Sequence, residues 1–92
     1  MKPVKIYTTS YCPFCRRAKD FFASQNVGYE EVDVTEDSAL REKLVELSGG
    51  MKTVPQIFIG DTHVGGYTDV MALHQSGKLV PLLSDDSTPA QR

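Results

Sequence analysis

Two cysteines, Cys12 and Cys15, are the residues of this 92-residue chain whose types and spacing point most clearly to chemistry. Only Pro13 and Phe14 separate them. A disulfide across so short a loop removes little conformational entropy from the unfolded chain, so stabilisation is a poor reason for it. The pair is better explained by redox chemistry or by metal binding. A Cys-x-x-Cys pair with proline after the first cysteine, between strand and helix signals, favours redox chemistry.

The position of the pair in the chain predicts a different role for each thiol. Pro13 suits the first position of a helix, which makes Cys12 the N-cap. Unpaired amides and the helix dipole stabilise an anion there, so Cys12 is predicted to be the thiolate that attacks a disulfide. Cys15 lies one turn further along the same face. Shielded by the helix, Cys15 would keep a high pKa and resolve the mixed disulfide.

Local charge should favour the thiolate, because the first 19 residues hold five cations and no acid. These cations are Lys2, Lys5, Arg16, Arg17 and Lys19. The whole chain is by contrast slightly acidic, with 10 Lys and Arg against 12 Asp and Glu. The basic start of the chain is therefore expected to lie around the cysteines.

A metal site is the alternative use of the two cysteines. Zinc would need two more ligands, and the chain offers His63 and His74. Ten residues separate these histidines, whereas about three to five separate a histidine pair in a structural zinc site. We therefore assign no metal ligands and prefer the redox interpretation.

Hydrophobic patterning predicts four short strands that must position the cysteines. They are placed at residues 4–8, 29–34, 54–60 and 62–64. The Gly60–Asp61 connection favours an antiparallel hairpin between the last two strands. The acid-rich run over residues 30–37 is expected to be a solvated edge.

Apolar residues at helical spacing predict three helices. They cover residues 13–25, 38–48 and 68–77, and a short turn or helix follows at 79–83. Asp37 or Ser38 can cap the second helix, and Thr68 or Asp69 the third. Gly49–Gly50 should end the second helix.

The element order β-α-β-α-β-β-α predicts an α/β fold with a four-stranded mixed sheet and helices on both of its faces. We expect one domain over residues 1–84 and a polar tail over 85–92. The net charge of −2 argues against nucleic-acid binding, and no apolar run approaches the roughly 18 residues of a membrane span. The start of the chain lacks a signal-peptide pattern, so a cytoplasmic location is expected.

Three motifs in order make the sequence resemble the glutaredoxins, specifically the small bacterial-type dithiol class. They are Cys12-Pro13-Phe14-Cys15, Thr53-Val54-Pro55-Gln56-Ile57-Phe58-Ile59-Gly60 and Gly65-Gly66-Tyr67-Thr68-Asp69. The resemblance covers about residues 3–83. It implies a thioredoxin fold and an enzyme that reduces protein disulfides and glutathione mixed disulfides. We expect a monomer. Glutathione would be the electron donor, and no cofactor would be tightly bound.

The resemblance also implies a glutathione site around a cis Pro55. The backbone of Val54 would lie opposite Cys12 and pair with the cysteinyl part of glutathione. The amides of Thr68 and Asp69 would hold the γ-glutamyl carboxylate, while the Asp69 side chain faces the amino group. Lys52 would pair with the glycyl carboxylate, aided by Gln56. The implied binding residues are Phe14, Lys52, Thr53, Val54, Pro55, Gln56, Gly66, Tyr67, Thr68 and Asp69.

The chain departs from the family pattern at three positions. Phe14 replaces a tyrosine, Thr9 replaces a basic residue three positions before the first cysteine, and Tyr67 replaces a third cysteine. Two roles also have simpler explanations: Lys52 as a solvated loop charge and Asp69 as a helix cap.

Two other functions stay open at this point. One is an enzyme of the same fold that takes its electrons from thioredoxin reductase. Lys52, Thr68 and Asp69 favour glutathione as the donor instead. The other is a scaffold in which two copies share an iron–sulfur cluster or metal ion through Cys12. Pro13 disfavours cluster assembly.

Overall fold

The computed structural model describes residues 2–51 and 53–83. Its elements run in the order predicted from the sequence, with the residues after the third helix forming a fourth, short helix. The elements are β1 Val4–Thr8, α1 Pro13–Ser24, β2 Glu30–Asp33, α2 Ser38–Leu47, β3 Gln56–Ile59, β4 Thr62–Gly65, α3 Tyr67–Gln75 and α4 Leu79–Leu83. The predicted tail, residues 85–92, and Lys52 lie outside the described residues.

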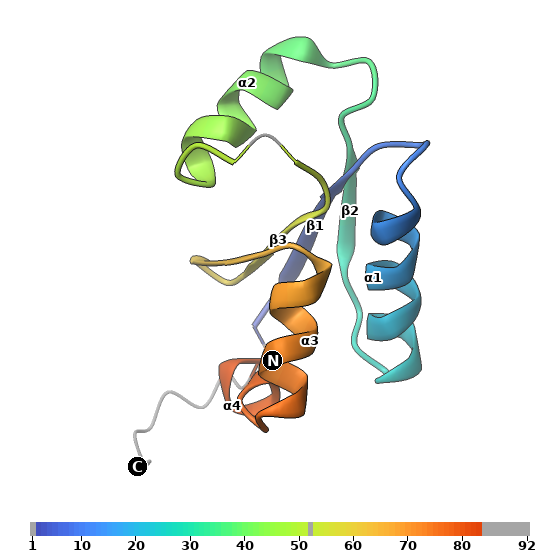
Figure 1. Ribbon diagram of the computed structural model, residues 1–92, viewed down its shortest axis with the longest axis vertical. Helices are drawn as coiled ribbons and strands as arrows, with labels where there is room; N and C mark the ends of the chain where they lie inside the picture. Colours follow the sequence, from blue (N-terminus) through green and yellow to red (C-terminus); the bar gives the residue numbers. More distant parts are fainter. Residues whose placement is uncertain (1, 52, 84–92) are drawn as a thin grey trace.

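The four strands form one mixed sheet in the order β2-β1-β3-β4 (Figure 1). β1 pairs in parallel with β2 and antiparallel with β3, and β3 pairs antiparallel with β4. Gly60, at a φ of 59°, turns the chain between β3 and β4, where an L side chain would be strained. The predicted mixed sheet and its closing hairpin are both confirmed.

Helices cover both faces of the sheet, as predicted, because residues alternate between its two sides. Val4 and Ile6 of β1 face a core that α1, α3 and α4 cover, and Tyr7 faces a second, smaller core beneath α2 (Figure 1). The buried residues of the first core are Val4, Ile6, Ala18, Phe22, Val27, Ile57, Ile59, Val70, Leu79 and Leu83. Those of the second are Tyr7, Val34 and Leu44. No helix among the described residues is long and apolar enough to cross a membrane.

Two strands are shorter than their sequence patterns predict. Val34 was expected inside the second strand but lies just beyond it, although its N–H still bonds the Thr8 carbonyl at 2.9 Å. β3 begins at Gln56, after a cis peptide bond between Val54 and Pro55. Apolar character therefore continues past the strand ends, because burial extends into the connecting loops.

The start of α3 corrects the predicted cap. The N-cap is Gly66, and the helix begins at Tyr67, which places Thr68 and Asp69 inside its first turn. The Asp69 carboxylate reaches back to accept the Gly66 N–H at 2.9 Å. Asp69 thus satisfies the N–H that precedes the helix, whereas no side chain at the N-cap position accepts a hydrogen bond from the first turn.

Candidate active site

Cys12 is the N-cap of α1, and Pro13 occupies the first helical position, as predicted. The backbone of Cys12 is extended, at φ −99° and ψ 110°, which turns its sulfur toward the first turn of the helix. There Sγ accepts the N–H of Cys15 at 3.1 Å. Cys12 is partly exposed while Cys15 is buried, and both are free thiols. The arrangement presents one accessible sulfur at the positive end of a helix.

The loop before β3 faces the Cys12 sulfur. The Val54–Pro55 peptide bond is cis, and the Cys12 thiol donates to the Val54 carbonyl oxygen at 3.5 Å. Both features are those that the family resemblance implied. They bring a backbone segment from 42 positions further along the chain against the reactive sulfur.

Gln56 supports this loop from inside the protein. Its side chain is fully buried, and its Nε2 donates to the Thr53 carbonyl oxygen at 2.8 Å and to Thr53 Oγ1 at 3.3 Å. Its Oε1 lies 2.7 Å from Nε2 of His63. The amide is thus hydrogen-bonded to Thr53 and His63, and the expectation that Gln56 aids Lys52 in pairing with a carboxylate stays a prediction. Because side chains alternate along β3, Gln56 lies on the same face of the sheet as Phe58, which packs against the second core.

A hollow of about 190 Å³ lies between the start of α1, the loop with the cis bond and the start of α3. Its lining residues are Phe14, Thr53, Val54, Pro55, Gly66, Tyr67 and Thr68. All of them belong to the set that the resemblance implied. The Phe14 ring forms one wall, with its centroid 6.1 Å from that of Tyr67 and 5.0 Å from Cζ of Arg17.

The first turn of α3 offers backbone donors beside this hollow. The first hydrogen bond of the helix runs from the Val70 N–H to the Gly66 carbonyl at 3.1 Å, so the amides of Tyr67, Thr68 and Asp69 precede it. Gly65 is required before this turn, since its φ is 120° and a Cβ there would collide with the Asp69 carboxylate. Such a helix start suits a negatively charged group.

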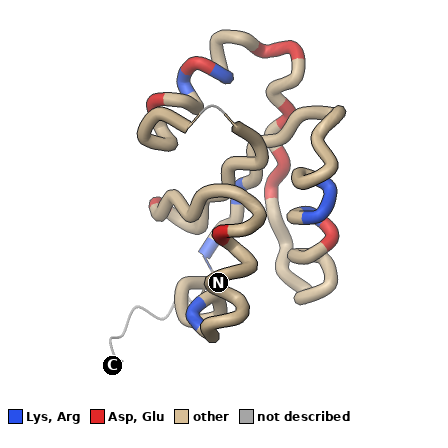
Figure 2. The backbone as a smooth tube through the Cα atoms, in the orientation of Figure 1, with Lys and Arg blue, Asp and Glu red and all other residues tan. Residues whose placement is uncertain are grey.

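A second hollow, of about 720 Å³, opens on the other side of α1, between that helix and β2. Both cysteines line it. So do Thr9, Ser10, Tyr11, Pro13, Arg16, Lys19, Asp20, Tyr29, Glu31 and Asp33. Glu31 accepts hydrogen bonds from Lys19 Nζ at 2.9 Å and from Thr8 Oγ1 at 2.7 Å. In Figure 2 the basic stretch of α1 lies beside the acidic residues of β2.

The buried cysteine is held as a thiol. Burial raises the pKa of Cys15 to about 12, and the hydrogen bond with Cys12 adds to the effect. A backbone hydrogen bond with Thr9 and the positive charge of Lys19 act in the opposite direction. The prediction that Cys15 keeps a high pKa is confirmed, because a thiolate without water around it is costly.

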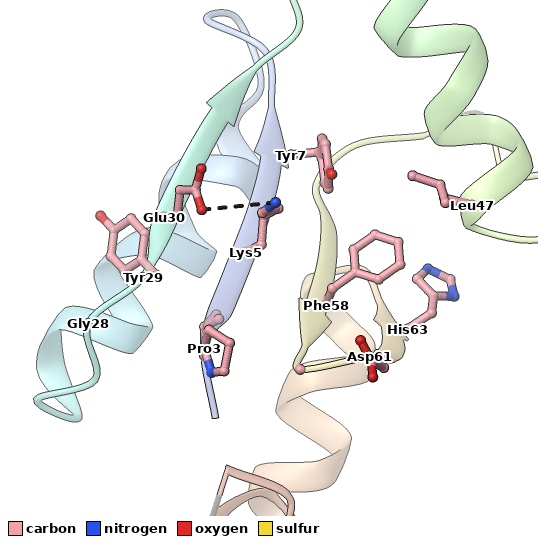
Figure 3. A pocket seen from close by; sticks show the side chains of 12 residues that line it. Pro3, Lys5, Tyr7, Gly28, Tyr29, Glu30, Leu47, Phe58, Asp61 and His63 are labelled. Atoms are coloured by element: carbon pink, nitrogen blue, oxygen red, sulfur yellow. Dashed lines mark ion pairs between the residues drawn. The ribbon is translucent and has the colours of Figure 1, made fainter. Parts of the chain in front are cut away.

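The five cations of the first 19 residues do not gather around the cysteines, which corrects a prediction from the sequence. Only Arg16 and Lys19 line the hollow beside the thiols. Lys5 pairs with Glu30 at 4.0 Å on the opposite face of the sheet, beside a separate cavity of about 680 Å³ (Figure 3). Strand alternation sends neighbouring side chains to opposite faces, so charges close in sequence are separated in space.

Arg41 of α2 is a site-proximal residue that the sequence patterns did not indicate. Its Nη1 lies 3.2 Å from the hydroxyl of Tyr11, the residue before Cys12. With Thr53 and Val54, Arg41 also lines a hollow of about 230 Å³. No local signal marks this residue, because the packing of α2 against the loop before β3 is what brings it here. Within the described parts of the chain, no three His, Cys, Asp or Glu side chains gather as a metal site would require.

Known proteins are similar to this chain in sequence and in fold. The glutaredoxin family model matches residues 4–64. The glutaredoxin of Pseudomonas aeruginosa is 48% identical over 84 residues, which cover 91% of this chain and 99% of that protein. Glutaredoxin 3 of Escherichia coli K12 is 45% identical over 83 residues, covering 90% and 99% of the two chains. The solved buckwheat glutaredoxin–glutathione complex superposes with a TM-score of 0.82 at 34% identity, covering 89% of this chain and 76% of that one.

The matches agree with the fold, and the residues that the family model matches include the cysteine pair. A parallel and antiparallel mixed sheet, a thiol at a helix start and a facing cis-proline loop together form the thioredoxin fold with its Cys-x-x-Cys site. The chain therefore belongs to the glutaredoxin family and is a thiol–disulfide oxidoreductase with the Cys12/Cys15 pair.

Proposed function

We propose that this glutaredoxin reduces glutathione mixed disulfides and protein disulfides, with glutathione as its electron donor. The observation that carries the proposal is the environment of the Cys12 sulfur. It sits at the helix start, 3.1 Å from the Cys15 amide and 3.5 Å from the carbonyl oxygen of Val54, a residue that lines the hollow of about 190 Å³. The buckwheat relative was solved as a complex with glutathione, which supports the same ligand here.

In the one-thiol route, Cys12 acts alone. The Cys12 thiolate attacks the glutathione sulfur of a glutathionylated protein, and the protein thiolate leaves with the electron pair of the broken bond. A second glutathione, as thiolate, attacks the glutathione held on Cys12. Glutathione disulfide forms and the Cys12 thiolate is restored, stabilised again by the amides of the first turn.

In the two-thiol route, Cys15 completes the reaction. Cys12 first attacks a protein disulfide and forms a mixed disulfide with one of its sulfurs. Cys15 then loses its proton and attacks Cys12 Sγ, the mixed disulfide breaks, and the substrate leaves as a thiolate. Two glutathione molecules afterwards reduce the Cys12–Cys15 disulfide. Because Cys15 is a buried thiol with a pKa of about 12, it does not compete with Cys12 for the first attack.

Glutathione would lie along the hollow of about 190 Å³ as a short added strand. Its cysteinyl part pairs with the Val54 backbone, and its γ-glutamyl carboxylate meets the first-turn amides of Thr68 and Asp69. Lys52 and Arg41 supply positive charge for the glycyl carboxylate. A cytoplasmic location fits this chemistry, since glutathione keeps thiols reduced there.

Turnover of a small glutathione mixed disulfide tests the proposal, with glutathione, glutathione reductase and NADPH loss as the readout. We expect wild type and Cys15→Ser to be active and Cys12→Ser to be inactive. Activity that survives in Cys12→Ser would contradict the assignment of the nucleophile. Folded wild-type protein that reduces a protein disulfide only with thioredoxin reductase would contradict glutathione as donor.

A further inference from the structure

Lys19 and Cys15 lie one helical turn apart on α1 and line the same hollow, on the side away from the proposed glutathione site. Cys15 is 1% exposed, whereas the Lys19 side chain is 29% exposed at the mouth of the hollow. Within the described residues, this hollow gives water a path toward the resolving thiol. The reaction of Cys15 must therefore occur in the field of the charges that line it.

The Lys19 ammonium is fixed in place by β2. Glu31 accepts its hydrogen bond at 2.9 Å and is itself held by the hydroxyl of Thr8, fully buried in β1, at 2.7 Å. The contact with Glu31 raises the pKa of Lys19, so the ammonium keeps its charge through the neutral range. Glu31 in turn has a lowered pKa, which makes it a poor proton acceptor.

We propose that Lys19, held in position by Glu31 and Thr8, accelerates the two-thiol route by stabilising the Cys15 thiolate as it attacks the mixed disulfide on Cys12. The inference rests on the two-thiol step of the proposed function. It assigns no part to Lys19 in the one-thiol route, since Cys12 receives its stabilisation from the amides of the helix start. The Lys19–Glu31 pair thus acts on the reaction of Cys15 and not on that of Cys12.

The step balances without any group beyond those already named. Cys15 releases its proton to water in the hollow, and its thiolate attacks Cys12 Sγ. The bond between Cys12 and the substrate sulfur breaks, and the substrate leaves as a thiolate with the electron pair. The two cysteines are oxidised to a disulfide while the substrate is reduced. Lys19 keeps all its protons and acts through its charge alone.

Several titratable and charged groups face the same hollow as Cys15. From α1 they are Arg16, Lys19 and Asp20, from β2 they are Glu31 and Asp33, and the neighbouring titratable groups are Cys12 and Tyr29. The charge of Lys19 lowers the pKa of Cys15. Removing this charge should therefore raise the pKa of Cys15 and lower the fraction of Cys15 present as thiolate.

The expected slowing in a variant without the Lys19 charge follows from two opposing consequences of a higher Cys15 pKa. A neighbouring opposite charge shifts a pKa by about one unit at the lower end of the usual range, which suits a partly exposed ammonium. One unit lowers the thiolate fraction about tenfold, but the more basic thiolate is a better nucleophile with a Brønsted coefficient of about 0.4–0.5. The expected net slowing is about three- to fourfold.

Stopped-flow reaction with equimolar 5,5′-dithiobis(2-nitrobenzoate) isolates this step. Cys12 releases the first coloured thiolate in a second-order phase, and Cys15 releases the second in a phase that does not depend on reagent concentration. In Lys19→Gln we expect an unchanged first phase and a second phase slowed about three- to fourfold. The rising pH profile of the second phase should move to higher pH.

Matched variants separate charge from structure. Lys19→Arg keeps the charge and should restore the second phase. Lys5→Gln removes the same charge from the Lys5–Glu30 pair on the other face of β1 and β2 (Figure 3), and should leave both phases unchanged. In the Cys15→Ser background, Lys19→Gln should have no effect on turnover of a glutathione mixed disulfide.

Three results would overturn the inference. They are an unchanged second phase in Lys19→Gln, equal slowing of both phases, or an effect of Lys19→Gln that persists in the Cys15→Ser background. The reagent contains no glutathione, so these results are independent of the electron donor. A protein that fails with glutathione but shows the Lys19 effect would contradict the proposed function and leave the role of Lys19 supported.

Discussion

Gln56 is expected to contribute both to the stability of the fold and to the binding of glutathione. It is buried, and it bonds the Thr53 backbone and faces His63. Gln56→Met keeps the approximate volume but removes these bonds, so we expect the free energy of unfolding to fall by about 1 kcal/mol. Because the loop with Thr53 and Val54 loses its support, KM for glutathione should rise. Urea unfolding and steady-state kinetics measure the two effects.

The control for this prediction is a small disulfide that reacts with Cys12 without binding to the loop that holds Thr53 and Val54. The second-order reaction of Cys12 with a small disulfide reagent should change little in Gln56→Met. An unchanged KM together with reduced stability would show that Gln56 serves the core alone.

The raised pKa of Cys15 predicts selective modification of Cys12. At neutral pH Cys15 is a buried thiol with a pKa of about 12, so iodoacetamide should label native protein once and urea-unfolded protein twice. Intact mass spectrometry followed by peptide mapping gives the count and the position. Equal labelling of both cysteines in the native state would contradict the burial on which the two roles depend.

The same pKa predicts a difference in stability at alkaline pH. The folded-state pKa of Cys15 lies above the ordinary value of 9.0, so the folded protein holds this proton more tightly than the unfolded chain. Its contribution is complete below pH 9.0 and is lost as the pH rises toward about 12. Unfolding midpoints of wild type should therefore fall more steeply across this window than those of Cys15→Ser. Parallel curves for the two proteins would contradict the shift.

At the residue scale, patterns local in sequence predicted what local geometry controls. Cys12, Pro13 and Cys15 sit within one helical turn, so their spacing alone predicted the cap and the shielded second thiol. Lys19 was named only as one of five cations and Arg41 was not named, because the contacts of Lys19 with β2 and of Arg41 with Tyr11 are encoded by no short motif.

At the element scale, the two acidic caps offer a matched pair of variants. Asp37 is the N-cap of α2 and accepts the Leu40 N–H at 2.9 Å, while Asp69 accepts the Gly66 N–H at the same distance. We expect Asp37→Ala and Asp69→Ala to lower the free energy of unfolding by about 1 kcal/mol each. Only Asp69→Ala should also raise KM for glutathione, because α3 begins beside the proposed binding hollow. Thermal unfolding and kinetics on both variants check this.

Asp69 has two roles in this view, and the pair of variants distinguishes them. If both variants raise KM equally, loss of helix stability explains the effect and Asp69 is a cap only. If neither raises KM, the Asp69 side chain takes no part in binding glutathione.

Element order was predictable because each helix and strand shows its own periodicity, but element ends were less so. The predicted cap at Thr68 or Asp69 was wrong since those residues are good caps by type, whereas the chain uses Gly66 with Asp69 reaching back. The second strand was predicted too long because Val34 is buried in the second core, with Tyr7 and Leu44, although it lies beyond the end of β2. Tertiary packing decided both cases.

At the scale of the whole molecule, two hollows flank the start of α1, and both cysteines line only the larger of them. One lies toward α3 and the loop before β3, and the other lies toward β2. A ligand that occupies the first leaves the second open to water, so Cys15 can lose its proton while the substrate sulfur is still attached to Cys12. The two routes of the proposed function therefore use opposite sides of one helix.

We expect a monomer in solution, and this is the prediction that tests the cluster-carrying alternative. The large apolar side chains exposed among the described residues are Tyr11, Phe14, Tyr29, Leu47, Met51 and Val80. Tyr29 and Leu47 line one cavity, but the charged Lys5, Glu30 and Asp61 line it too. A stable interface buries about 800 Å² on each partner, and its centre is depleted of such charged residues. Sedimentation with absorbance detection should give the mass of one chain and no visible colour. A coloured species with the mass of two chains, lost in Cys12→Ser, would instead identify a cluster bridged through Cys12.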